Sequence, residues 1–288
     1  MSAARLLSKL QVEHPADSLV PVVYRLDTDG ESLHEWLGRR VTLRATGRII
    51  CSACGNTTRK SYGGGHCYRC FKTLARCDLC VMAPQRCPYA AGTCREPQWG
   101  EDFCMQPHWV YLSNVTGLKV GITRRGLERG RWVDQGAVQG RLLARTKSRH
   151  AAGLLEVDIA QNVSDRGQWR QMVSTTPTPL DLNAAAQELA ARYATQHPEA
   201  EFLAASEVQQ ITYPVTHWPP PNRLNFRQAP IHEGVLCGIK GQFLLFEHGV
   251  FNVREHTGYE AEISVSDDRD ASSRGAKPRI QPQLELFK

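Results

Sequence analysis

The chain has 288 residues, of which 41% are hydrophobic, and 35 Lys plus Arg stand against 29 Asp plus Glu. This length can bury a sizeable core and favours two compact units, and no apolar run approaches the roughly 20 residues of a membrane-spanning helix. Because residues 1–9 are too short and interrupted for a secretory signal, we expect a cytoplasmic protein without membrane contact. The mild positive charge permits contact with phosphates without requiring it.

The first predicted unit, residues 1–50, is a β segment that leads into a group of cysteines. Apolar and polar side chains alternate along residues 41–50, which predicts one or two strands. Nine of the ten cysteines then fall within residues 51–107, and only Cys237 lies elsewhere. Because clustered thiols in a reducing cytosol are more often metal ligands than disulfides, we interpret residues 51–107 as a metal-binding cysteine module.

Two CxxC pairs at the start of this module have the spacing of a zinc ribbon. Cys51 and Cys54 are followed, after twelve intervening residues, by Cys67 and Cys70. Each pair places two thiolates on one side of a tight turn, and the two pairs together complete a tetrahedron. Glycines beside both pairs give the backbone the freedom that such turns need. The pattern predicts a closed, structural zinc site.

The other five cysteines of the module predict a second metal site. Five thiols exceed what one tetrahedral ion needs, so we expect a second zinc ion bound by Cys77, Cys80 and two of the remaining three. A four-thiolate iron–sulfur cluster is the alternative, and His108 is either a further ligand or an ordinary structural histidine. The five candidate ligands are Cys77, Cys80, Cys87, Cys94 and Cys104.

The third predicted unit, residues 108–165, begins with a β-hairpin. Two short apolar runs within residues 109–122 flank a turn built on Asn114 and Gly117. Two helices should follow, the second of which has a partly apolar face at 3.6-residue spacing. The predicted helices cover residues 126–133 and 148–161.

Three sequence features of this unit follow one another in a set order. One strand carries Tyr111 in His-Trp-Val-Tyr-Leu, a second carries Lys119 in Lys-Val-Gly-Ile-Thr, and Arg129 follows on a predicted helix. This order resembles the GIY-YIG nuclease superfamily, in which a later helix carries a glutamate, and Glu156 stands where that glutamate falls. The resemblance spans residues 108–161 and implies a small β-sheet with flanking helices.

The resemblance implies roles in phosphodiester hydrolysis for four residues. Glu156 would hold a catalytic Mg²⁺ or Mn²⁺ ion, Arg129 would offset charge on the phosphoryl oxygens, and Tyr111 would help to deprotonate the attacking water. Lys119 occupies the place of the family's second tyrosine, and the first triplet is Trp-Val-Tyr rather than Gly-Ile-Tyr. These departures leave a catalytically inactive binding module as the alternative.

A cluster of basic residues in the same unit predicts contact with nucleic-acid phosphates. Such contacts would be independent of sequence and sensitive to salt, and the neighbouring Trp132 could stack on a base. DNA is the expected partner, and RNA is the alternative. The cluster comprises Arg124, Arg125, Arg129, Arg131, Arg141, Arg145, Lys147 and Arg149.

The fourth predicted unit, residues 166–265, is a helix followed by a mostly β domain, so that the whole chain is expected to be α+β. Asp181 or Asn183 should cap a helix over residues 180–196. Gly238 and Gly241 flank two residues and predict a hairpin turn. Strands are predicted over residues 211–215, 234–239, 242–246 and 260–265.

The last predicted unit, residues 266–288, is a polar, disordered tether that ends in a short apolar peptide. The peptide Gln-Leu-Glu-Leu-Phe resembles the segment by which bacterial repair and replication enzymes bind the DNA sliding clamp, and its contact residues would be Gln283, Leu284, Leu286 and Phe287. Together the features favour a metal-dependent DNA endonuclease of repair or replication that the clamp recruits. The alternative is a catalytically inactive, zinc-containing DNA- or RNA-binding module.

Overall fold

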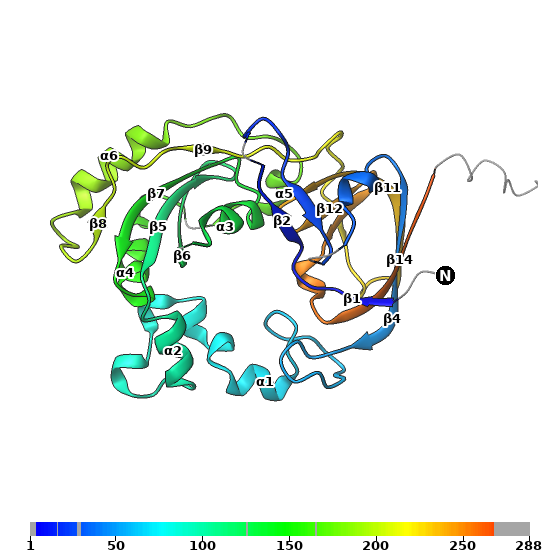
Figure 1. The fold of residues 1–288 in the computed structure, drawn as a ribbon, viewed down its shortest axis with the longest axis horizontal. Helices are drawn as coiled ribbons and strands as arrows, with labels where there is room; N and C mark the ends of the chain where they lie inside the picture. Colours follow the sequence, from blue (N-terminus) through cyan, green and yellow to red (C-terminus); the bar gives the residue numbers. More distant parts are fainter. Residues whose placement is uncertain (1–3, 16, 28–29, 125, 165, 268–288) are drawn as a thin grey trace, which may run out of the picture.

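The computed structural model describes residues 4–15, 17–27, 30–124, 126–164 and 166–267. The fold is α+β, as expected, and its two lobes each contain a β-sheet, with the cysteine module joining them along one side (Figure 1). Within the described ranges, no helix is both long enough and apolar enough to cross a membrane.

The β lobe is a seven-stranded sheet assembled from both ends of the chain. Neighbouring strands are antiparallel, except that β10 runs parallel to β13. The third strand of the sheet, β4, comes from the N-terminal segment and lies between two strands from the C-terminal part. In sheet order the strands are β1 (Ala4–Leu6), β14 (Tyr259–Ser266), β4 (Arg40–Ile49), β11 (Ile231–Lys240), β12 (Phe243–Phe246), β13 (Gly249–Asn252) and β10 (Arg223–Leu224).

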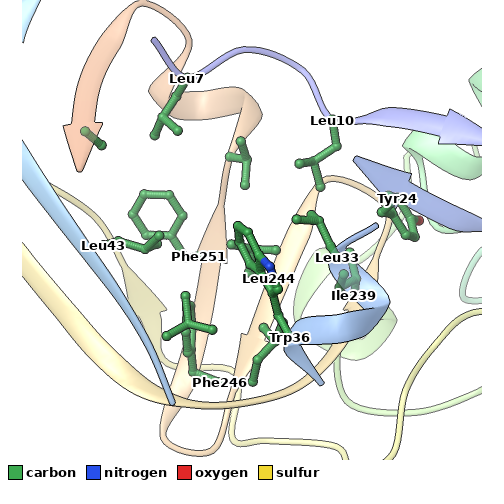
Figure 2. Packing of buried hydrophobic residues seen from close by; sticks show 14 of the residues in the cluster. Leu7, Leu10, Tyr24, Leu33, Trp36, Leu43, Ile239, Leu244, Phe246 and Phe251 are labelled. Carbon is green, nitrogen blue, oxygen red and sulfur yellow. The ribbon is translucent and has the colours of Figure 1, made fainter. Parts of the chain in front are cut away.

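The core of the β lobe lies between this sheet and the N-terminal segment. Leu43 on β4 and Phe251 on β13 face Leu10, Leu33 and their neighbours, as Figure 2 shows. The N-terminal segment adds β2 (Gln11–Glu13), β3 (Val23–Arg25) and the 3₁₀ helix η1 (Leu33–Trp36). Burial of these side chains ties residues from both ends of the chain into one hydrophobic core.

The second lobe is a five-stranded sheet covered by helices. The order is β6 (Leu118–Arg124), β5 (His108–Asn114), β7 (Gln139–Thr146) and β8 (Glu201–Phe202), and β9 (Gln209–Gln210) also pairs with β7. The predicted hairpin is confirmed as β5 and β6. The three predicted helices are confirmed as α3 (Glu128–Asp134), α4 (Arg149–Ile159) and α6 (Leu182–Tyr193), and the short α5 (Trp169–Met172) lies between the last two.

The cysteine module contains short helices and little other regular structure. Two α-helices lie on either side of four single 3₁₀ turns. These elements are α1 (Tyr68–Thr73), η2 (Ala75–Cys77), η3 (Leu79–Val81), η4 (Pro84–Arg86), η5 (Tyr89–Ala91) and α2 (Pro97–Phe103). A further 3₁₀ helix, η6 (Arg254–His256), lies in the β lobe.

Several predictions for the C-terminal part need correction. The strand predicted over residues 211–215 is wrong, because Pro214 cannot donate to a ladder and the segment makes only an isolated bridge between Val215 and Gly238. The predicted hairpin turn lies later, since Ile239 and Lys240 still belong to β11 and Gly241, with φ +63°, begins the turn. The strand β13 was not predicted.

Candidate metal centre and candidate active site

Four thiols at the start of the cysteine module gather around one point. The sulfur atoms of Cys51, Cys54, Cys67 and Cys70 all lie within 4.8 Å of one another, and those of Cys54 and Cys67 are 3.9 Å apart. With metal–sulfur bonds of about 2.3 Å, a tetrahedral zinc ion separates its ligands by about 3.8 Å. The arrangement therefore fits a zinc ion bound by four thiolates, as the CxxC spacing predicts.

Hydrogen bonding favours ionised sulfur at this centre. Burial acts to raise the pKa of Cys51, but amide groups of Cys67, Cys54 and Ala53 donate to its sulfur and hold the pKa below its ordinary value. Hydrogen bonding to Cys67 raises the pKa of Cys70, because the first thiolate formed resists the ionisation of its neighbours. A bound cation offsets the repulsion between neighbouring thiolates, so metal binding here should release protons from the thiols.

The four-thiol centre is attached to the β lobe. The Ser61 hydroxyl donates to the Thr257 carbonyl at 3.1 Å, and the Ile50 amide donates to the Gly258 carbonyl at 2.7 Å. Gly65 has φ +102°, and a Cβ at this position would lie 2.6 Å from the Thr257 side chain. Only glycine therefore permits this close approach between the metal-binding loop and the sheet.

Four of the other five cysteines of the module lie around one pocket, and the sequence did not show which four. Cys80, Cys87, Cys94 and Cys104 line one small pocket, whereas Cys77, which we expected to pair with Cys80, is not among its lining residues. His108 is buried on β5 with Nδ1 2.8 Å from the Gln106 carbonyl, and burial lowers its pKa to about 4. These contacts fit the interpretation of His108 as an ordinary structural histidine rather than a metal ligand.

Tyr111 lies on the face of the second sheet that is turned toward α3. It pairs with Gly121 across the hairpin, and a Cβ at Gly121 would lie 2.5 Å from the Tyr111 hydroxyl. The tyrosine ring therefore occupies the space above that glycine. Trp132 on α3 meets the ring edge-on, with the ring centroids 6.1 Å apart, so Trp132 serves as a core residue here and its buried ring is not free to stack on a base.

Arg131 on α3 and Gln135, the residue that caps the end of α3, hold the Tyr111 hydroxyl. In the amide orientation that satisfies its neighbours, the Gln135 oxygen accepts from the Tyr111 hydroxyl at 3.0 Å and from Arg131 Nε at 3.0 Å. Burial raises the pKa of Tyr111, and the opposing effect of the Arg131 charge and hydrogen bond is smaller. Near neutral pH, Tyr111 is thus a neutral phenol.

The other two predicted catalytic residues near this face are Lys119 and Glu156. Lys119 is buried on β6 with Nζ 3.1 Å from the Val120 carbonyl, and it lines a pocket between the lobes together with Gln135 and Arg223. Glu156 is half-buried on α4, and its charge acts on both Tyr111 and Arg149. Glu156 is therefore electrostatically coupled to the tyrosine.

Arg129 does not join this group. Its Nε donates to the Gln209 side chain at 2.6 Å, and the residue is exposed beside a different pocket, near His14 and Glu207. Arg131, rather than Arg129, is the arginine that reaches Tyr111. Gln135, one helical turn after Arg131, was not predicted as a site residue. An (i, i+4) pair of long polar side chains on a short helix is a signal that could have identified both.

A family model described as a protein of unknown function (DUF2797) matches residues 38–261. The chain belongs to this family. The matched part of the DUF2797 chain contains the complete cysteine module, the Tyr111 face and every strand from β4 to β13. No curated protein and no solved structure matches the chain.

The basic cluster of this DUF2797 protein does not form one surface stripe. Arg141 is buried with its guanidinium bonded to backbone carbonyls and Asn183, and Arg145 faces Glu201 at 3.5 Å. Arg124 stacks on Phe103, and Arg149 donates to the Val81 carbonyl at 2.5 Å. Lys147 is exposed. Arg125 and the clamp-like residues Gln283, Leu284, Leu286 and Phe287 lie outside the described residues.

Proposed function

We propose that this DUF2797 protein is a metal-dependent endonuclease of the GIY-YIG type that acts on DNA in repair or replication. The observation that carries the proposal is the hydrogen-bonded group of Tyr111, Arg131 and Gln135, coupled to the charge of Glu156. The order of elements also supports it, because a hairpin, a helix with the arginine, a third strand and a helix with the glutamate follow one another.

The residues suit phosphodiester hydrolysis in distinct roles. Arg131 would bind the phosphoryl oxygens and offset the charge that develops on them. Tyr111, as a neutral phenol, would orient Arg131 and Gln135 rather than accept the proton of the attacking water. Lys119 would contribute positive charge beside Gln135.

The chain offers Glu156 as the carboxylate for a catalytic metal ion. Mg²⁺ is commonly held by one or two carboxylates together with substrate phosphates, so one half-buried glutamate fits this chemistry. A Mg²⁺ or Mn²⁺ ion bound there would polarise the phosphate and stabilise the leaving oxygen.

A cleavage assay on labelled forked, flapped and gapped DNA tests the proposal. The full chain should nick at least one of these substrates with Mg²⁺ or Mn²⁺ and not with EDTA. Glu156→Gln should reduce the rate by at least about 100-fold. Glu188→Gln is the matched control, because Glu188 is an exposed helix glutamate that pairs with Arg192. Equal rates in both variants would exclude the Glu156 metal site.

A catalytically inactive nucleic-acid-binding module is the second candidate, and the burial of Tyr111 and Lys119 favours it. Tyr111 is fully buried in this conformation, and Lys119 is only 8% exposed. This candidate predicts binding to DNA or RNA that weakens steeply with salt, and no nicking with any divalent metal. The same assay, repeated with RNA substrates, distinguishes it from the endonuclease.

Recruitment by the DNA sliding clamp is a further part of the proposal and depends on the sequence of residues 283–287 alone. Tethering to a ring around DNA would raise the local concentration of the enzyme at its substrate. Pull-down of purified clamp by the full chain, but not by a chain lacking residues 283–288, is the expected result. Equal retention of clamp by both chains would contradict it.

A further inference from the structure

The thiols of Cys80, Cys87, Cys94 and Cys104 converge on one pocket in the second half of the cysteine module. All four line the pocket, and electrostatic interactions link Cys80 to each of the other three. The same interactions link Cys104 to Cys87 and Cys94. Four convergent thiols from one short segment are more typical of metal ligands than of unrelated core cysteines.

The segment that carries these thiols has almost no hydrophobic core of its own. The buried residues in its helices and 3₁₀ turns are Ala75, Pro84 and Gly100, while Leu79 and Met82 are exposed. Ordering about thirty residues costs tens of kcal/mol of conformational entropy, which so little burial does not offset. Small segments of this kind are held by metals or disulfides, and all ten cysteines in the structure are free thiols.

The spacing of the second set differs from that of the first. Among the described residues, Cys51, Cys54, Cys67 and Cys70 are the thiols that gather within 4.8 Å of one another. Cys80, Cys87, Cys94 and Cys104 do not gather as closely and instead surround a pocket. A zinc ion needs sulfurs about 3.8 Å apart, whereas an iron–sulfur cluster holds its cysteines further apart, because each binds a different iron.

The other residues around the pocket suit a cluster as well. Ala75, Tyr89, Trp99 and Gly100 line it with aromatic and aliphatic groups, and its two charged residues, Asp78 and Arg95, pair with each other at 2.7 Å. Such a lining limits the access of water to the cluster sulfides. Gly100 packs tightly, since a Cβ there would lie 3.0 Å from the Tyr89 ring and 3.4 Å from the Cys94 sulfur.

We propose that Cys80, Cys87, Cys94 and Cys104 bind a [4Fe–4S] cluster, and that the chain therefore holds two different metal centres. Cys77 is not a ligand of either one. The zinc centre is attached to the β lobe, and the cluster is attached to the lobe that carries the Tyr111 face.

The cluster has a direct structural connection to α4. The Arg149 amide donates to the Cys104 carbonyl at 2.7 Å, and the Arg149 side chain donates to the Val81 carbonyl. A Cβ at Gly153 would lie 2.5 Å from the Pro84 side chain, so the loop between Cys80 and Cys87 packs closely on the helix. The cluster thereby fixes the position of the helix that carries Glu156.

The positive charge of Arg149 also compensates the thiolates. This side chain is half-buried and interacts electrostatically with both Cys104 and Cys80. A cluster with four thiolate ligands has net negative charge, and a fixed cation beside it lowers the cost of keeping that charge away from water.

Metal and sulfide analysis of the full chain, purified without oxygen, tests the inference. Wild type should contain about four iron and four acid-labile sulfide ions together with about one zinc ion per chain. Mössbauer spectroscopy of the wild type identifies the cluster type without any substitution. A chain with two zinc ions and no sulfide, or with no second metal, would overturn the proposal.

Four serine variants separate the two centres. Cys87→Ser and Cys94→Ser should lose most of the iron and sulfide and keep the zinc, whereas Cys54→Ser should lose the zinc and keep the iron. Cys77→Ser is the matched control, because it removes a cysteine of the same segment that does not line the pocket. Loss of iron in Cys77→Ser, or its retention in Cys87→Ser, would contradict the assigned ligands. These readouts do not depend on nuclease activity.

Discussion

The two faces of the sheet formed by β6, β5 and β7 differ in what their side chains do. On one face Val110, Leu112 and Ile122 pack against α4 and α6 in a continuous hydrophobic cluster. On the other, Tyr111 lies over Gly121 and its hydroxyl is held by the polar side chains of Arg131 and Gln135, on α3 and at its C-terminal end. Apolar packing accounts for these three side chains of the first face, whereas the second face also buries a hydrogen-bonded polar group, the Tyr111 hydroxyl.

The largest expected effect on stability belongs to the apolar face. Leu112→Ala should lower the free energy of unfolding by about 2–5 kcal/mol, because it leaves a cavity under α4. Ser113→Ala is the control on the adjacent position, where the buried hydroxyl has no hydrogen-bond partner among the described residues, and it should be nearly neutral. Urea denaturation of the metal-loaded protein measures both. A larger loss of unfolding free energy in Ser113→Ala than in Leu112→Ala would contradict the difference between the two faces.

Gly121→Ala should destabilise the polar face by more than the addition of a single methyl group suggests. The added methyl would lie 2.5 Å from the Tyr111 hydroxyl, so the ring must move, at a cost of about 1–3 kcal/mol. Gly130→Ala on α3 is the control, since a Cβ there meets nothing within 4 Å. Thermal unfolding compares the two. If both variants are equally stable, the ring is not confined above Gly121.

The stability contributed by Tyr111 should depend on pH in the alkaline range. Burial raises the pKa of Tyr111 above its ordinary value of 10.0. Above that pH the unfolded state ionises first, so stability is present below pH 10 and is lost as the pH rises. Between pH 9 and 11, wild type should lose more stability than Tyr111→Phe. Parallel pH profiles of urea denaturation would show instead that the phenol is solvated.

The smallest expected effect concerns the predicted basic stripe. Arg145 pairs with Glu201 at 3.5 Å, and both side chains are more than 40% exposed. Arg145→Gln should therefore change the free energy of unfolding by no more than about 1 kcal/mol. It should also change DNA affinity little, because the glutamate already neutralises the charge. A strong loss of DNA binding would restore the phosphate-binding role inferred from the sequence.

Local sequence patterns predicted the local elements of this fold. The CxxC pairs, the β5–β6 hairpin and the helices α3, α4 and α6 depend on residues close together in the chain. The seven-stranded sheet was not predicted, because β4 pairs with β11 and β14 about two hundred residues later, and no local pattern encodes such a pairing.

The choice between Arg129 and Arg131 shows why part of the site could not be predicted. Residues two apart on an α-helix point about 200° away from each other, so a small error in helix phase exchanges the residue that faces the sheet. The helix is only seven residues long and has two buried side chains, Trp132 and Val133, to fix that phase. The predicted pairing of Cys77 with Cys80 rested on their CxxC spacing alone, and Cys77 is not among the residues that line the pocket with Cys80.

The cleavage rates of Arg131→Gln and Arg129→Gln test the central claim most directly. Both substitutions remove the same charge from α3, but Arg131 alone contacts the Gln135 side chain that holds Tyr111. Cleavage of branched DNA with Mg²⁺ or Mn²⁺ should fall by at least about 100-fold in Arg131→Gln and by no more than about twofold in Arg129→Gln. Equal rates in the two variants, or a larger loss in Arg129→Gln, would contradict the account.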